Sequence, residues 1–125
     1  MKEAYVSFET AKLIKEKGFN WPTIEYYSSS GSIYRFADGI ADICGILSYQ
    51  RPTQQIACRW LREEKGIFID IRVYSGLPVQ FGYDISVLYP DKTLVDKGGT
   101  FGYSSYEEAT ENGLKYVLQN LSKYL

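Results

Sequence analysis

Two aspartates are the strongest candidates for catalytic chemistry in this sequence. Asp70 and Asp84 lie on the polar face of two alternating apolar–polar segments, Ile67–Tyr74 and Val79–Tyr89, which we expect to pair as an antiparallel hairpin. If the turn is centred at Leu77, the two carboxylates lie directly opposite each other. They are then close enough to share a proton or a divalent cation.

A second register of the same hairpin predicts a structural ion pair and no catalytic site. Moving the turn by one residue pairs Arg72 with Asp84 as a cross-strand ion pair, and Arg72 is near in either register. Because like charges directly opposite each other are unfavourable, this shifted register is the favoured one. A metal-dependent enzyme at Asp70 and Asp84 is therefore the weakest of three functional hypotheses, and we assign no catalytic residue.

The lack of histidine and the scarcity of cysteine exclude several classes of catalytic and metal-binding site. The chain has no histidine, which removes Ser-His and Cys-His nucleophile pairs and every histidine-ligated metal site. Cys44 and Cys58 match no zinc spacing, and we expect them to be reduced thiols rather than a disulfide. The sequence therefore predicts no metal and no cofactor.

Aromatic rings beside cations are the second feature that could bind a ligand, since the chain has 12 tyrosines. Stacking surfaces with arginines are typical of proteins that bind nucleotides or single-stranded nucleic acid. Residues 1–65 carry nine basic and eight acidic side chains, a net charge of +1, so no broad basic surface is expected. The alternative interpretation is that the tyrosines pack in the sheet with their hydroxyls at its rim, or form a protein interface. The candidate binding residues are Tyr26, Tyr27, Tyr34, Arg35, Arg59 and Arg62.

The glycine-rich stretch Lys97–Gly102 precedes a predicted helix, as phosphate-binding loops do. Its spacing matches neither the Walker nor the dinucleotide pattern, and Glu107 and Glu108 occupy the first turn of that helix. We expect a flexible connection here.

Three helices are expected to position these residues. The first runs from Ser7 to Lys17 and the second from Thr53 to Lys65, each with a hydroxyl cap at its start and a glycine directly after its end. The third begins at Ser104 or Ser105. Gly113 lies on its apolar face, which predicts a close backbone approach to the sheet or to another helix.

A second hairpin is predicted in the first half of the chain. Ile33–Phe36 and Ile40–Tyr49 flank Ala37-Asp38-Gly39, a strong hairpin signal, although residues 40–47 also fit a short helix. A strand near Thr23 precedes this hairpin, and a short strand over Thr93–Val95 follows the 67–89 hairpin.

Three stretches together resemble small phage and prophage-type bacterial proteins of unknown function. They are Tyr5–Leu13 continuing through Lys15–Phe19, then Pro52–Gln55 with Trp60–Glu63, then Ser105–Ala109 with Gly113–Leu114. The resemblance covers under half of the chain. It implies a phage or mobile-element context, and it supplies no activity and no catalytic residue.

The sequence as a whole predicts a single α+β domain over residues 1–125, with three helices on one face of an antiparallel sheet of about four strands. The expected order is α-β-β-α-β-β-α. With a net charge of −1 and no signal peptide or apolar run of membrane-spanning length, the expected location is the cytoplasm. The preferred function is a non-enzymatic interaction module that binds a protein partner or itself; a nucleotide or single-stranded nucleic-acid binder is the alternative.

Overall fold

The computed structural model describes residues 4–35 and 48–124, which form three α-helices and two antiparallel three-stranded sheets. The helices are α1 (Phe8–Glu16), α2 (Gln54–Trp60) and α3 (Tyr106–Gln119), with a π-helical turn η2 (Leu61–Lys65) after α2 and a 3-10 turn η3 (Leu121–Lys123) after α3. The strands are β1 (Glu25–Tyr27), β2 (Ile33–Arg35), β3 (Tyr49–Gln50), β4 (Ile67–Tyr74), β5 (Gln80–Leu88) and β6 (Leu94–Tyr103).

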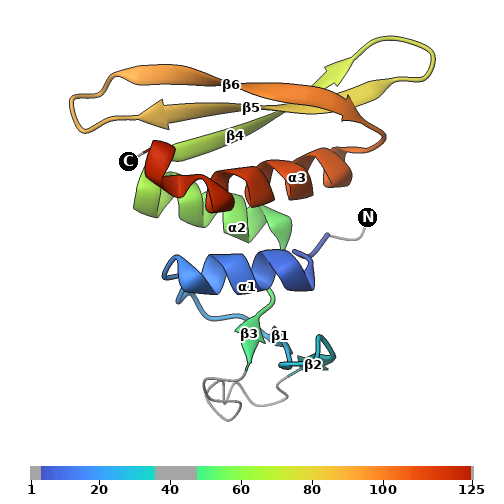
Figure 1. Ribbon diagram of the computed structural model, residues 1–125, viewed down its shortest axis with the longest axis vertical. Helices are drawn as coiled ribbons and strands as arrows, with labels where there is room; N and C mark the ends of the chain where they lie inside the picture. Colours follow the sequence, from blue (N-terminus) through green and yellow to red (C-terminus); the bar gives the residue numbers. More distant parts are fainter. Residues whose placement is uncertain (1–3, 36–47, 125) are drawn as a thin grey trace.

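The elements are stacked in layers along the long axis of the molecule (Figure 1). The large sheet, in the order β4-β5-β6, lies at one end and is covered on one face by α3, and α2 packs against α3. Next comes α1, and the small sheet, in the order β2-β1-β3, lies at the other end. The predicted α+β class is confirmed, whereas the predicted single sheet of about four strands is wrong.

The small sheet corrects the predicted hairpin in the first half of the chain. Its central strand is β1, which pairs with β2 on one side and with β3 on the other. The predicted hairpin would pair residues 33–36 with residues 40–49. The described parts of these two segments, β2 and β3, are instead separated by β1, because the turn at Ser28–Ser32 brings β2 back against β1. The turn at Ala37-Asp38-Gly39, and the choice between strand and helix over residues 40–47, lie outside the described residues.

The predicted helix caps are confirmed. The hydroxyls of Ser7, Thr53 and Ser105 accept hydrogen bonds from amides in the first turns of α1, α2 and α3, at 3.2, 3.2 and 3.1 Å. Beyond the end of α1, the amide of Phe19 donates to the carbonyl of Ile14 at 3.1 Å, as in a Schellman ending.

In the large sheet, β4 and β5 pair with Asp70 directly opposite Asp84, so the turn is centred at Leu77 and the shifted register is wrong. The second correction concerns β6, which is ten residues long and includes the glycine-rich stretch predicted to be a flexible connection. Glycines are required there because a Cβ on Gly99 would lie 1.8 Å from the carbonyl oxygen of Tyr83 on β5.

The main core lies between the large sheet and the helices. Its largest fully buried apolar side chains are Val6, Ile14, Leu61, Ile67, Ile85, Val87, Leu114, Val117 and Leu118. The close approach predicted at Gly113 is confirmed, since a Cβ there would lie 3.0 Å from Cγ2 of Ile69 and 3.2 Å from Cγ of Tyr83. Within the described residues, no helix is both long enough and apolar enough to cross a bilayer.

One acidic side chain ties the three helices together. The carboxylate of Glu111 on α3 accepts hydrogen bonds from the amide and hydroxyl of Ser7, at 3.2 and 2.6 Å, and from the hydroxyl of Thr10. It also accepts one from Nε2 of Gln54 on α2, at 3.3 Å. A negative charge is thereby placed at the positive N-terminal end of α1, where it is favourable.

Candidate binding groove

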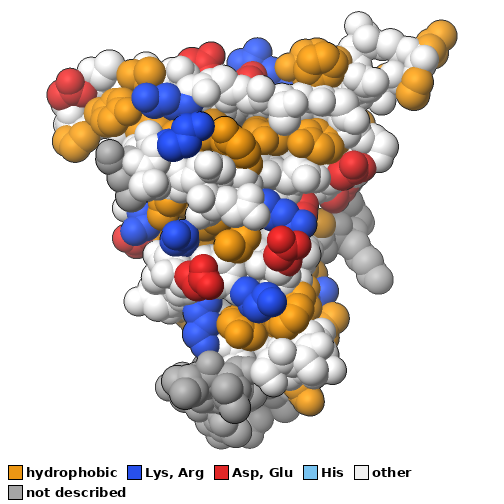
Figure 2. Space-filling model, in the orientation of Figure 1, with side chains coloured by type: hydrophobic (Ala, Val, Ile, Leu, Met, Phe, Trp, Pro, Cys, Tyr) orange, Lys and Arg blue, Asp and Glu red, His pale blue; other side chains and the backbone are white. Residues whose placement is uncertain are grey.

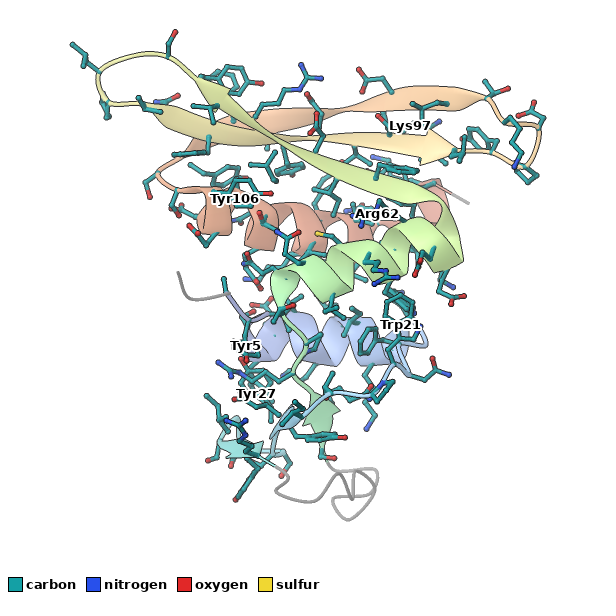
Figure 3. The ribbon with its side chains drawn as sticks, turned by 180° about the vertical axis from the view of Figure 1, so that it is seen from behind. Tyr5, Trp21, Tyr27, Arg62, Lys97 and Tyr106 are labelled. Atoms are coloured by element: carbon teal, nitrogen blue, oxygen red, sulfur yellow. The ribbon has the colours of Figure 1, made fainter. Side chains whose placement is uncertain are left out.

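The six candidate binding residues predicted from the sequence do not form one surface. Tyr26 and Tyr27 are buried in the small sheet, and the hydroxyl of Tyr27 donates to the carbonyl of Val6 at 2.6 Å. Figure 3 shows Tyr27 near the small sheet and Arg62 near the large sheet, with α1 and α2 between them. The rings of Tyr26 and Tyr27 therefore face the protein interior and do not offer a platform for a stacked base.

The other four candidates are exposed but separate. Tyr34 and Arg35 lie on the exposed strand β2, at the small-sheet end of the molecule. Arg59 lies on α2 in an ion pair with Glu63 at 3.4 Å, and Arg62 lies on η2. Positive and negative side chains are interspersed on the face shown in Figure 2. These four residues therefore do not form a basic surface beside stacking rings.

The aspartate pair is held by an arginine. Nε of Arg72 lies 2.5 Å from Oδ2 of Asp84 and 3.5 Å from Oδ2 of Asp70, so one guanidinium bridges both carboxylates. This bridge offsets the repulsion that made the direct register unfavourable in the sequence analysis. Among the described residues, no group of three histidine, cysteine, aspartate or glutamate side chains could hold a metal ion.

Far from the aspartate pair, beside the small sheet, an arginine stacked on tyrosine rings forms the base of a groove. The guanidinium of Arg51 lies 4.0 Å from the ring centre of Tyr5 and 5.4 Å from that of Tyr27. Its Nη1 atom pairs with Oε1 of Glu25 at 2.6 Å, and both side chains are largely buried. Cation–π stacking and the ion pair together fix the guanidinium in one position.

The groove itself has a volume of about 490 Å³ and opens to solvent. We call it the Trp21 groove; it is lined by Tyr5, Trp21, Pro22, Thr23, Ile24, Glu25, Arg51, Pro52, Thr53 and Ile56. In Figure 3, Tyr5 and Trp21 lie on either side of the chain that leads from β3 into α2. Most of these lining side chains are apolar or aromatic, and Ile24 is 62% exposed.

Hydrogen bonds hold the walls of the Trp21 groove in place. Nε2 of Gln50 donates to the carbonyl of Trp21 at 2.5 Å. The carbonyl of Glu25 accepts from the hydroxyl of Thr23 at 2.9 Å and from the amide of Arg51 at 3.0 Å. The groove is therefore pre-formed, which lowers the entropic cost of binding a ligand.

The sequence analysis did not identify the Trp21 groove. Its residues come from three separate segments, and no periodicity or motif relates Tyr5 to Trp21 or Ile56. One signal was present: Trp21 and Ile24 are large apolar residues in a proline-containing segment with no regular periodicity. Large apolar residues in an exposed connecting segment are candidates for a binding surface.

A scan against protein-family models found no match, and searches of curated proteins and of solved structures found none either.

Proposed function

We propose that this protein is a small non-enzymatic interaction module whose Trp21 groove binds an apolar segment of a partner protein. The observation that carries the proposal is the groove's open apolar lining, with Tyr5, Trp21, Ile24 and Ile56 exposed to one shared cavity. Leaving such surface in water is unfavourable, by roughly 25 cal/mol per Å², and a partner that covers it gains that free energy.

The charges around the groove favour an apolar ligand over an anionic one. Arg51, the cation in the lining, is already paired with Glu25 at 2.6 Å, and the two charges cancel locally. A phosphate or carboxylate would have to displace Glu25 to gain the guanidinium. An aromatic or aliphatic anchor residue can instead pack on Trp21, Ile24 and Pro22 without breaking that pair.

The proposed partner is an extended peptide segment of another protein. Aromatic-lined grooves on other proteins bind extended peptide segments. The resemblance to small phage-type proteins fits this proposal, because an accessory protein encoded by a phage acts by binding a host or phage protein.

Peptide selection tests the proposed function directly. A random-peptide display library is selected on the immobilised wild-type protein, and the recovered peptides are then tested for binding to an Ile24→Glu variant, which places a charge in the groove. Leu94→Glu is the matched control, because Leu94 is 60% exposed, close to Ile24 at 62%, but lies on β6 of the large sheet.

We expect recovered peptides to carry an apolar or aromatic anchor and to bind Ile24→Glu at least about tenfold more weakly, or about 1.4 kcal/mol. Binding to Leu94→Glu should equal binding to the wild-type protein. Peptides that bind Ile24→Glu as tightly as the wild type would reject the groove as the site.

A further inference from the structure

Strand β4 is an edge strand whose protection against pairing consists of two charged side chains of opposite sign, Asp70 and Arg72. Among the described residues its only strand neighbour is β5, and the two strands pair over the whole of β4 without a register shift. The other edge strand, β6, has register shifts against β5. Proteins normally blunt edges with charged side chains, bulges, prolines or a covering element. β4 contains no proline, and Figure 3 shows no described element drawn across it.

The backbone groups that β4 presents at its free edge belong to its odd-numbered residues. The carbonyl of Gly66 accepts from the amide of Leu88 at 2.8 Å, so residue 66 points its polar backbone groups toward β5. Because this direction alternates along a strand, the N–H and C=O groups of Ile69, Ile71 and Val73 point away from β5. An added antiparallel strand must hydrogen-bond to these residues.

The sequence of β4 is complementary to itself around Ile71. On either side of this residue lie Asp70 and Arg72, then Ile69 and Val73, then Phe68 and Tyr74. A two-fold axis at Ile71 would set each residue opposite its counterpart: an acid opposite a base, an aliphatic opposite an aliphatic, and an aromatic opposite an aromatic. Each of these is a favourable cross-strand pair.

We propose that two copies of this chain dimerise by antiparallel pairing of β4 with the partner's β4, with the two-fold axis at Ile71. The two sheets then form one continuous six-stranded sheet. Ile71 and the partner's Ile71 form a hydrogen-bonded pair, which matches the outward direction of their backbone groups. Asp70 and the partner's Arg72 form a non-hydrogen-bonded pair, in which side chains approach most closely.

The neighbouring two-fold registers are disfavoured by charge. An axis at residue 70 sets Asp70 against the partner's Asp70, and an axis at residue 72 sets Arg72 against the partner's Arg72. The charged groups are accessible, because the side chains of Asp70 and Arg72 are 68% and 58% exposed. Both ion pairs made by Arg72 within the chain use Nε. In the proposed dimer, the terminal nitrogens of its guanidinium pair with the partner's Asp70, and the two Nε pairs are kept.

The proposed dimer also gives a role to an apolar side chain at the edge. Val73 is 63% exposed, although it lies on the same face of β4 as Ile67 and Ile69, which contact the core. In the dimer Val73 pairs with the partner's Ile69, so the aliphatic row of one chain continues into that of the other.

Sedimentation velocity of the full chain over a concentration series tests the dimer and its register. The wild-type protein is expected to be a dimer at high concentration, and Asp70→Arg and Arg72→Glu are each expected to raise the dimer Kd at least tenfold by setting like charges opposite each other. An equimolar mixture of the two variants should regain the dimer, because each new side chain then meets its opposite charge in the other variant. Lys97→Glu on β6 is the matched charge reversal on the other edge, and it should leave the Kd unchanged.

Val73→Pro keeps the test decisive if a charge variant fails to fold. Its amide points to the free edge, so proline removes a hydrogen bond of the dimer and none of the β4–β5 pairing. Circular dichroism should show that this variant is folded, and sedimentation velocity should show that it is a monomer. Three results would each overturn the proposal: a wild-type monomer at every concentration up to about 1 mM, a dimer indifferent to these variants, or a mixture that stays monomeric. None of these results bears on peptide binding in the Trp21 groove, which is formed within one chain.

Discussion

Cys58 is buried among core side chains, and this burial raises the pKa of its thiol to about 11, from an ordinary value near 9. Because the thiolate is the reactive form, Cys58 should be inert at pH 8 in the folded protein. We expect a Cys44→Ser variant, which leaves Cys58 as the single thiol, to react with a disulfide reagent only as fast as it unfolds. Fast stoichiometric labelling without denaturant would contradict this burial.

Tyr83 and Tyr124 make stability sensitive to alkaline pH. Burial raises the pKa of each phenol to about 12 in the folded protein, whereas in the unfolded chain each ionises near its ordinary value of about 10. Their stabilising effect is therefore complete below about pH 10 and is lost as the pH rises toward 12, because ionisation then favours the unfolded chain. Urea unfolding between pH 8 and pH 11.5 should show this decline.

Tyr83→Phe should make the alkaline decline shallower, since phenylalanine has no proton to lose. Tyr106→Phe is the control, because Tyr106 is exposed and starts α3. An equal decline for wild type and Tyr83→Phe would show that ionisation of Tyr83 does not drive the alkaline loss of stability.

At the scale of elements, α1 depends on a capping charge supplied by another helix. Glu111→Gln replaces the carboxylate that accepts from Ser7, Thr10 and Gln54, and its amide group would face these donors. We expect a loss of about 1–3 kcal/mol in the free energy of unfolding, measured in urea. Glu107→Gln, one turn earlier on α3 and with an exposed side chain, should change stability by less than about 0.5 kcal/mol. Equal effects for the two variants would mean that the Glu111 network contributes nothing specific.

The elements also show which parts of the fold could be predicted from sequence. Helix caps at Ser7 and Thr53, and the close approach at Gly113, follow from local chemistry and are confirmed. The register of β4 against β5 was predicted wrongly because the repulsion between Asp70 and Asp84 was weighed without the bridge that Arg72 forms to both carboxylates.

Strand β6 was predicted only at its start, as a short strand over Thr93–Val95, and the rest of it was missed for a different reason. Its glycines break the alternating pattern that marks a strand, yet Gly99 lies so close to the carbonyl of Tyr83 that no side chain would fit. That requirement arises only once β5 is alongside, so it is a tertiary constraint. The Trp21 groove was missed for the same kind of reason, because it exists only where three distant segments meet.

At the scale of the whole molecule, the layers separate two surfaces. The Trp21 groove lies beside the small sheet and the start of α2, whereas the free edge of β4 belongs to the large sheet, beyond α2 (Figure 3). One surface offers apolar side chains and the other offers unpaired backbone groups, so the first suits a peptide and the second suits another strand. A dimer through β4 would present two grooves and could bind a bivalent partner more tightly than one groove alone.

Chemical-shift mapping with a selected peptide tests the central claim, that the Trp21 groove is the binding site, most directly. Addition of the peptide to the isotope-labelled protein should shift the indole N–H of Trp21 and the amides of Ile24 and Ile56. The amides of Leu94 and Phe101, which are exposed on β6, should stay in place. Shifts confined to β6, with Trp21 and Ile24 unchanged, would contradict the account.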